Sequence, residues 1–405
     1  MKSRLKRLSG QLPSGGAAAA GKARTTATRG DALRKALGGE VVVRDNGEFV
    51  LVRRRHSGRY AHGRLTVADF LRRDDYCVSH VNLRAEPQPL DKKQFVFFDT
   101  ETTGLGGAGS LAFLVGVASI SDGALETRQY LIPDFADETA MLEALLEEFT
   151  PDSVVVSYNG RSFDEPLVTD RLRINRVARQ LPYQSHLDLL YPARSLFKRR
   201  IQDCSLTNVE ARVFGHERDG DIPGYLIPGV YFDWVHEDKT EQLAAVIEHN
   251  RQDIVSLALL LSVFAESHTS DGRSLSEALD VYSLALRAQA RKDHARAAEI
   301  SREREDELAA VGDREVDFRR SLVYKRAGDW SAALPLWERL EAGRDRIAQA
   351  ARLELAKWRE HRERDFVGAL RLTEKGIRFS LNHDRELADW RRRQIRLERR
   401  LAGLR

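Results

Sequence analysis

Two acidic residues at the end of an apolar run are the first candidates for chemistry in this chain. Asp99 and Glu101 follow Phe95-Val96-Phe97-Phe98 and stand two residues apart. On an extended strand, residues at this spacing project from the same face. Unpaired charge beside a buried apolar strand is costly, whereas paired carboxylates are suitable oxygen ligands for a divalent cation. The spacing therefore predicts half of a metal site, although two solvated acids at a strand end would have the same pattern.

A third acidic residue stands near the start of a predicted helix. The run 153–156 is rich in valine and predicts a short buried strand, and Asn159-Gly160 predicts a turn after it. Ser162 and Glu165 have the spacing of a capping box that opens a helix. Asp164 then falls in the first helical turn, where the helix dipole favours a carboxylate. Taken alone, this acid is equally consistent with a helix start that binds no ligand.

A histidine and a fourth acid share one face of a later helix. The segment 240–265 has apolar residues at helical spacing, and His249 and Asp253 lie four residues apart beside that stripe. This places both side chains at the rim of the core. An ordinary surface pair, worth roughly 0.2–0.5 kcal/mol, would look the same in isolation.

Taken together, the three segments resemble the DEDD exonuclease superfamily, whose ribonuclease-H-like fold gathers four acids around two metal ions. The resemblance implies an α/β mixed sheet with flanking helices. It places Asp99 and Glu101 in the first motif, Asp164 in the second and Asp253 in the third, all four as metal ligands. His249 falls at the position of the general base.

Within that superfamily the chain is most similar to the bacterial YprB-like group of predicted exonucleases. The similarity covers roughly residues 94–265 and includes the segments His186–Leu189 and 208–224. One feature departs from the superfamily pattern. One branch of the superfamily has a histidine with four residues between it and the aspartate of the third motif, and the other branch has a tyrosine with three. This chain has a histidine, His249, with three residues between it and Asp253. The two positions differ by about 100° around a helix, so His249 is expected to approach the metal-bound water from a different side.

The chemistry that these residues predict is phosphodiester hydrolysis. Two divalent ions about 3.5–4 Å apart activate a water and stabilise the leaving 3′ oxygen. Carboxylate oxygens select Mg²⁺ or Mn²⁺ over the metals that thiolates prefer. A neutral imidazole near pH 7 can accept the proton of the water, which typically contributes roughly 10²–10⁴-fold in rate. Glu101 is expected to bind metal and also to orient the water.

Several side chains near the acids are candidate substrate contacts. They are Thr102, Asn159, Phe163, Arg194, Lys198 and Arg199. The last three form a basic segment interleaved with Tyr191 and Phe197, and such a segment can follow phosphates and stack a base. A solvated helix face or loop accounts for this segment equally well.

Composition is consistent with a nuclease and excludes several other classes. The chain has 405 residues, of which 42% are hydrophobic, and a formal charge of +4 that permits a nucleic-acid partner. No segment approaches the roughly 18 consecutive apolar residues of a membrane helix. Cys77 and Cys204 are too few for a disulfide framework or a zinc site, which indicates a reducing cytoplasm.

The sequence predicts four regions. Residues 1–37 are expected to form a basic disordered arm because the first 29 carry basic residues and no acid. Residues 38–90 are interpreted as an N-terminal extension that contains a hairpin around Asn46-Gly47. Residues 91–268 are the predicted ribonuclease-H-like domain, and residues 269–405 are predicted to be helical.

The helical region contains a repeat. Three similar segments, 292–297, 328–333 and 364–369, recur at a spacing of 36 residues. Each predicts a turn between two antiparallel helices, similar to tetratricopeptide pairs, whose usual period is about 34. Such repeats suggest a protein partner, and a basic helix after Trp390 is expected to cap them.

The sequence therefore predicts a metal-dependent nuclease, in particular a 3′–5′ exonuclease that acts on single-stranded or frayed nucleic acid. A structure-specific endonuclease is one alternative. The other is a non-catalytic nucleic-acid-binding scaffold whose repeats recruit a partner. Retention of all four carboxylates argues against a scaffold.

Overall fold

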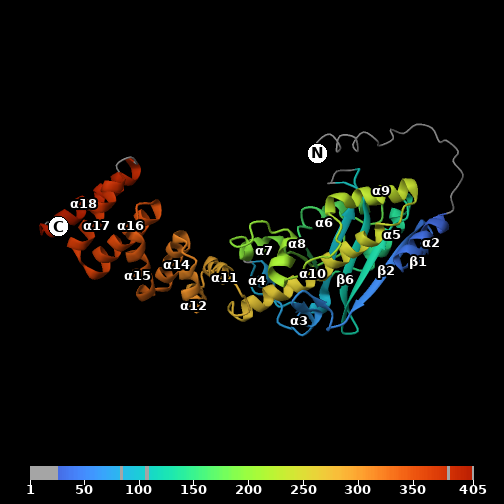
Figure 1. The fold of residues 1–405 in the computed structure, drawn as a ribbon, viewed down its shortest axis with the longest axis horizontal. Coiled ribbons are helices and arrows are strands. Elements are labelled where there is room, and N and C mark those ends of the chain that lie inside the picture. Colours follow the sequence, from blue (N-terminus) through green and yellow to red (C-terminus); the bar gives the residue numbers. More distant parts are fainter. Residues whose placement is uncertain (1–25, 83–84, 105–108, 381–383, 404–405) are drawn as a thin grey trace.

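The computed structural model describes residues 26–82, 85–104, 109–380 and 384–403. The predicted arm over residues 1–25 lies outside the described residues. A mixed sheet covered by helices forms one part of the chain, and a curved row of helices extends away from it (Figure 1). Among the described residues, no helix has the length and apolar character needed to cross a membrane.

The sheet has seven strands in the order β1-β2-β7-β6-β5-β8-β9. The strands are β1 (Glu40–Arg44), β2 (Gly47–His56), β5 (Phe95–Thr102), β6 (Ala112–Ser121), β7 (Ala124–Leu131), β8 (Val154–Ser157) and β9 (Ser185–Asp188). β5, β6 and β7 form an antiparallel meander, and β8 and β9 run parallel to β5. This is the predicted ribonuclease-H-like mixed sheet. A separate small hairpin pairs β3 (Ala61–His62) with β4 (Leu65–Thr66).

The side chains of β5 alternate between two apolar cores, one on each face of the sheet. Phe95 and Phe97 point into one apolar cluster, and Val96 and Phe98 point into the other. The first cluster is covered by α10 (Leu243–Thr269), with α3 (Val67–Leu71), α4 (Val78–Val81), α7 (Leu190–Phe197), α8 (Leu206–Val209) and the π-helical turn η3 (Glu210–Phe214). The second is covered by α5 (Glu138–Leu146), α6 (Asp164–Ile174) and α9 (Ile227–Glu237).

The N-terminal region differs from the prediction. Residues 26–37, expected to belong to a disordered arm, form the helix α2 (Thr26–Leu37). Leu33 and Leu37 are buried in the second core, and the Arg29 guanidinium lies 2.5 Å from Asp134. The hairpin formed by β1 and β2 is more than a packed extension, because β2 pairs with β7 and continues the sheet.

The C-terminal helices are arranged as antiparallel pairs. They are α11 (Ala278–Ala290), α12 (His294–Glu303), α13 (Glu305–Ala310), α14 (Arg314–Ala327), α15 (Trp330–Glu341), α16 (Arg346–Trp358), the π-helical η5 (Arg359–Glu363), α17 (Phe366–Phe379) and α18 (Asp384–Leu401).

The repeated sequence marks the turns, as predicted. Asp293, Asp329 and Asp365 each precede the second helix of a pair, and their carboxylates accept backbone amides at 3.2, 3.2 and 2.8 Å. The residue before each aspartate has a positive φ of 66°, 78° or 57°. The 36-residue period is therefore a repeated left-handed turn followed by an N-cap.

The first repeat helix is fixed to the sheet domain. The buried side chain of Arg287 on α11 donates to the carbonyl oxygens of His80 at 2.7 Å and Pro192 at 3.3 Å. Arg200, which follows α7, binds the Asp280 carboxylate at 2.6 Å. The first apolar core continues without interruption from α10 into the repeats.

Candidate active site

Asp99 and Glu101 lie at the end of β5 on the face covered by α10. The Asp99 Oδ2 atom accepts a hydrogen bond of 2.8 Å from the Asn250 side chain on that helix. Burial raises the pKa of Asp99 well above its ordinary range, and the negative charges of Asp253, Asp164 and Glu101 raise it further. The two acids on β5 therefore belong to one electrostatic group with the acids of the other predicted motifs.

The approach of α10 to β5 depends on a glycine. Gly116 on β6 pairs with Asp99 across the ladder, and a Cβ atom at this position would lie 2.2 Å from Asn250 Oδ1. Gln129, fully buried on β7, donates to Asn250 Oδ1 at 2.9 Å and to the Ile247 carbonyl at 2.7 Å. These contacts fix the amide that holds the Asp99 carboxylate.

Asp164 is the first residue of α6 and lies beside the same strand. The β8 ladder ends at Phe97, and beyond this point the Thr100 hydroxyl donates to Asp164 Oδ1 at 2.5 Å. Burial raises the pKa of Asp164 to about 6, although hydrogen bonds from Thr100 oppose the shift. The predicted capping box is wrong, because the N-cap of α6 is Phe163 and Ser162 stands one residue too early.

A further acid supports the loop before α6. Asp188, buried at the end of β9, accepts the backbone amides of Asn159 at 2.8 Å and Leu190 at 3.0 Å. Asn159 has a φ of +67°, as its predicted turn requires. Asp188 thereby connects the loop that carries the second motif to the neighbouring strand.

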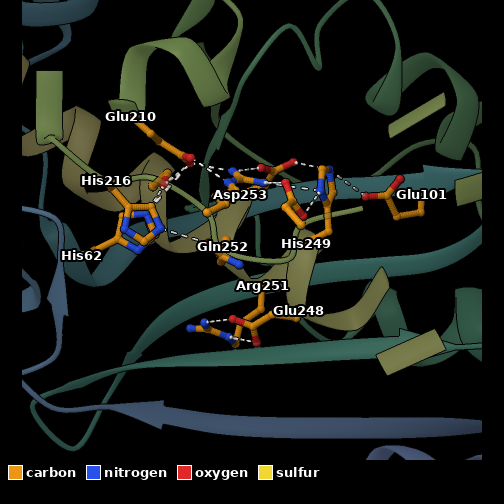
Figure 2. A network of polar contacts seen from close by, with 12 residues as sticks. His62, Glu101, Glu210, His216, Glu248, His249, Arg251, Gln252 and Asp253 are labelled. Carbon is orange, nitrogen blue, oxygen red and sulfur yellow. Dashed lines mark hydrogen bonds and ion pairs between the residues drawn. The ribbon is translucent and has the colours of Figure 1, made fainter. Parts of the chain in front are cut away.

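His249 and Asp253 project from α10 toward Glu101 (Figure 2). His249 Nε2 lies 3.5 Å from Asp253 Oδ2 and 4.0 Å from Glu101 Oε1. One ligand atom from each of the three residues lies within 4.8 Å of the others. Burial and the charges of Asp253 and Asp164 raise the pKa of Glu101 well above its ordinary range.

These residues fit a divalent cation site by the chemistry of their donors. Partly buried carboxylates that raise one another's pKa lack sufficient positive charge nearby. Hard oxygen ligands of this kind bind Mg²⁺ and Mn²⁺, and a bound cation would favour their ionised form. Asp99, Glu101, Asp164 and Asp253 are the residues that would hold such ions.

The structure also brings in three charged residues for which the sequence predicted no role. Arg218 donates to both oxygens of Glu210 at 2.6 Å, contacts Asp253, and lies 3.4 Å from Asp221. Its side chain is only 1% exposed. Glu210, Arg218 and Asp221 all lie in the segment 208–224. The charged run 216–221 was the one sequence feature that could have indicated a role for Arg218 and Asp221.

A second cluster, His62, Glu210 and His216, also brings three possible ligands within 4.8 Å of one another. His62 Nε2 lies 2.7 Å from Ser256 Oγ, and His216 Nε2 lies 2.9 Å from Gln252 Oε1. The guanidinium of Arg218 occupies both Glu210 oxygens, and its positive charge disfavours a cation there. This cluster is a buried polar network that supports Arg218.

The predicted substrate contacts are spread over several elements. Thr102 donates its hydroxyl to the Gly104 carbonyl at 2.7 Å. Phe163 is 56% exposed at the start of α6, and Arg194 and Lys198 are exposed on and after α7. Arg199 stacks on the Tyr282 ring of α11 at 5.5 Å and so contacts the repeats. Their roles in substrate binding stay predictions.

Comparisons with known proteins agree with this architecture. The sequence model of the RNase_H superfamily matches residues 96–265, which span strands β5 to β9 and most of α10 but not β1 and β2. The chain is 35% identical over 295 residues to the uncharacterized protein YprB of Bacillus subtilis (strain 168), which covers 71% of this chain and 70% of that protein. The chain therefore belongs to the YprB family, with a nuclease-type fold of the RNase H superfamily.

Proposed function

We propose that this protein is a metal-dependent nuclease that hydrolyses phosphodiester bonds from the 3′ end of single-stranded or frayed nucleic acid. The observation that carries this proposal is the mutual influence of acids from three separate elements. Asp253 and Asp164 both raise the pKa of Asp99 and of Glu101. Distant segments of the chain thus bring like charges together in a partly buried site, which is costly unless a cation balances them.

The residues of the chain have distinct roles in this proposal. The four acids hold two Mg²⁺ or Mn²⁺ ions, which when bound supply an activated water and stabilise charge on the leaving oxygen. Asn250 and Thr100 fix the carboxylates of Asp99 and Asp164. His249 directs Nε2 toward the acids and accepts a proton there.

The exposed side chains near α6 and α7 supply the substrate contacts. Phe163 is available to stack a base, and Arg194 and Lys198 are available to contact phosphates. The 3′ end of the nucleic acid would then enter between the start of α6 and the end of β5.

The test is release of mononucleotides from labelled single strands by the full-length protein with Mg²⁺ or Mn²⁺. DNA and RNA labelled at either end establish substrate and polarity, and a circular strand distinguishes exonuclease from endonuclease action. Asp99→Asn is expected to abolish cleavage, whereas Asp152→Asn, which changes an exposed acid before β8, should leave it intact. Binding without cleavage by the wild-type protein would contradict the proposal.

A further inference from the structure

His249 is held by a contact on the nitrogen that faces away from the four acids. Its Nδ1 atom lies 2.8 Å from Oδ1 of Asp221, while Nε2 lies near Asp253 and Glu101. Asp221 stands in the loop between η3 and α9, 28 residues before His249. The two ring nitrogens therefore face different partners.

The distances at Nδ1 indicate which tautomer is favoured. Arg218 Nη1 also lies near this nitrogen, at 3.4 Å. A neutral imidazole nitrogen cannot both donate to a carboxylate and accept from a guanidinium. The contact with Asp221 is the shorter by a wide margin and has an ordinary hydrogen-bond length. Nδ1 therefore carries the proton, and the Nε2 lone pair points toward Glu101 and Asp253.

Asp221 is itself held in place. Its Oδ2 atom lies 3.4 Å from Arg218, whose guanidinium is fixed by two bonds of 2.6 Å to the fully buried Glu210. The loop leaves η3 through Gly215 and turns again at Gly220, with φ values of 66° and 68°. These features fix the carboxylate relative to α10.

We infer that Asp221 is a positioning residue that sets the tautomer and the orientation of His249. This inference rests on the proposed function in one respect, the action of His249 as a base. At the shorter spacing of His249 and Asp253, the imidazole is thus oriented by a residue outside α10. Arg218 contributes by holding Asp221 and Asp253 on either side of the ring.

The decisive variant is Asp221→Asn. Arg218 favours the amide oxygen of the new side chain on its own side, so the amide nitrogen would face His249 and donate to Nδ1. The tautomer would then be inverted, with the proton on Nε2, as occurs when an aspartate behind a catalytic histidine is replaced by asparagine. Asp219→Asn is the matched control, because Asp219 is exposed in the same loop.

The first measurement needs no nuclease activity. Nitrogen NMR of the metal-free full chain, labelled with ¹⁵N-histidine and assigned with His249→Gln, reports the protonated ring nitrogen. At a pH where the ring is neutral, we expect the proton on Nδ1 in the wild type and in Asp219→Asn, and on Nε2 in Asp221→Asn. An unchanged tautomer in Asp221→Asn would overturn the inference.

The second measurement separates positioning from metal binding. In Asp221→Asn we expect kcat to fall by roughly 10²–10⁴-fold, with KM and the Mn²⁺ affinity unchanged. A large loss of Mn²⁺ affinity would make Asp221 a metal ligand and would overturn the inference. If the wild type cleaves nothing, the proposed function fails, while the NMR result still decides the role of Asp221.

Discussion

Gly116 lies opposite Asp99 across the β5–β6 ladder, and its missing side chain leaves the space through which Asn250 reaches the Asp99 carboxylate. A backbone feature of β6 thus determines how closely α10, which carries His249 and Asp253, approaches β5, which carries Asp99 and Glu101.

Gly116→Ala should therefore damage both stability and the site. The new Cβ would clash with Asn250 and Ile254, each 2.2 Å away, and overpacking of this kind costs about 1–3 kcal/mol. Denaturant unfolding measures this loss, and cleavage assays should show reduced kcat. Gly229→Ala on α9 is the control, because apart from its chain neighbours and the nearby backbone of α9 no atom lies within 4 Å of the added methyl group. Equal stability of the two variants would contradict the proposed packing.

Divalent metal should stabilise the folded protein through the four acids. Mn²⁺ at a hundred times its dissociation constant is expected to add about 2.7 kcal/mol to the free energy of unfolding. Thermal unfolding with Mn²⁺ or with EDTA measures the effect. Asp99→Asn should remove most of it, while Asp152→Asn should retain it. A stabilisation that is the same in both variants would place the ion elsewhere.

Asp164 should make the stability of the metal-free protein depend on pH. Its pKa rises from 3.8 to about 6 on folding, so its stabilising contribution is complete below pH 3.8 and is lost as the pH rises through 6. Asn cannot ionise. Asp164→Asn is therefore expected to gain stability over the wild type across this window, on the order of 2 kcal/mol at pH 7.

Urea unfolding of both proteins in EDTA at several pH values checks this. Comparing the two proteins removes the contribution of other groups such as the partly buried His186, whose pKa is lowered to about 4 by desolvation. A difference that does not change between pH 4 and pH 7 would show that Asp164 ionises freely.

Loss of a repeated N-cap should weaken the helical repeats without altering the site. Asp365→Ala removes the acceptor of the Gly368 amide at the start of α17, and such a change costs about 0.5–2 kcal/mol. Thermal unfolding measures the cost, and nuclease activity at low temperature should be unchanged. Glu374→Ala, on the exposed side of the same helix, should have little effect. Equal melting temperatures for both variants would argue against the cap.

Local patterns were sufficient to predict much of the fold. The apolar run before Asp99 and the valines before Ser157 predicted the strands β5 and β8, because a short apolar run is itself the pattern of a buried strand. In the structure the two strands are paired. The recurring segments with an aspartate predicted the repeat turns, because a turn and the helix start after it are also determined by neighbouring residues. The sequence also placed Glu101, His249 and Asp253 among the site residues, and the fold brings these three together. Their role as ligands and base stays a prediction.

Long-range contacts could not be predicted in this way. The helix α2 has few apolar residues, and its stability depends on burial of Leu33 and on the pairing of Arg29 with Asp134. The contact of Asp221 with His249 joins a loop to a helix and has no periodicity to reveal it. The sequence of the hairpin also could not predict that β2 pairs with β7.

The uninterrupted apolar cluster beneath α10 also bears on how this protein can be divided. Leu257 and Phe264 share it with Leu284 of α11, and it extends as far as Trp337 and Trp390. A fragment ending near residue 269 would present this surface to water and would be prone to self-association. A fragment that contains only the sheet domain would therefore need either the first repeat pair or polar replacements along α7 and α10, because the helical tail covers part of the apolar core of that domain.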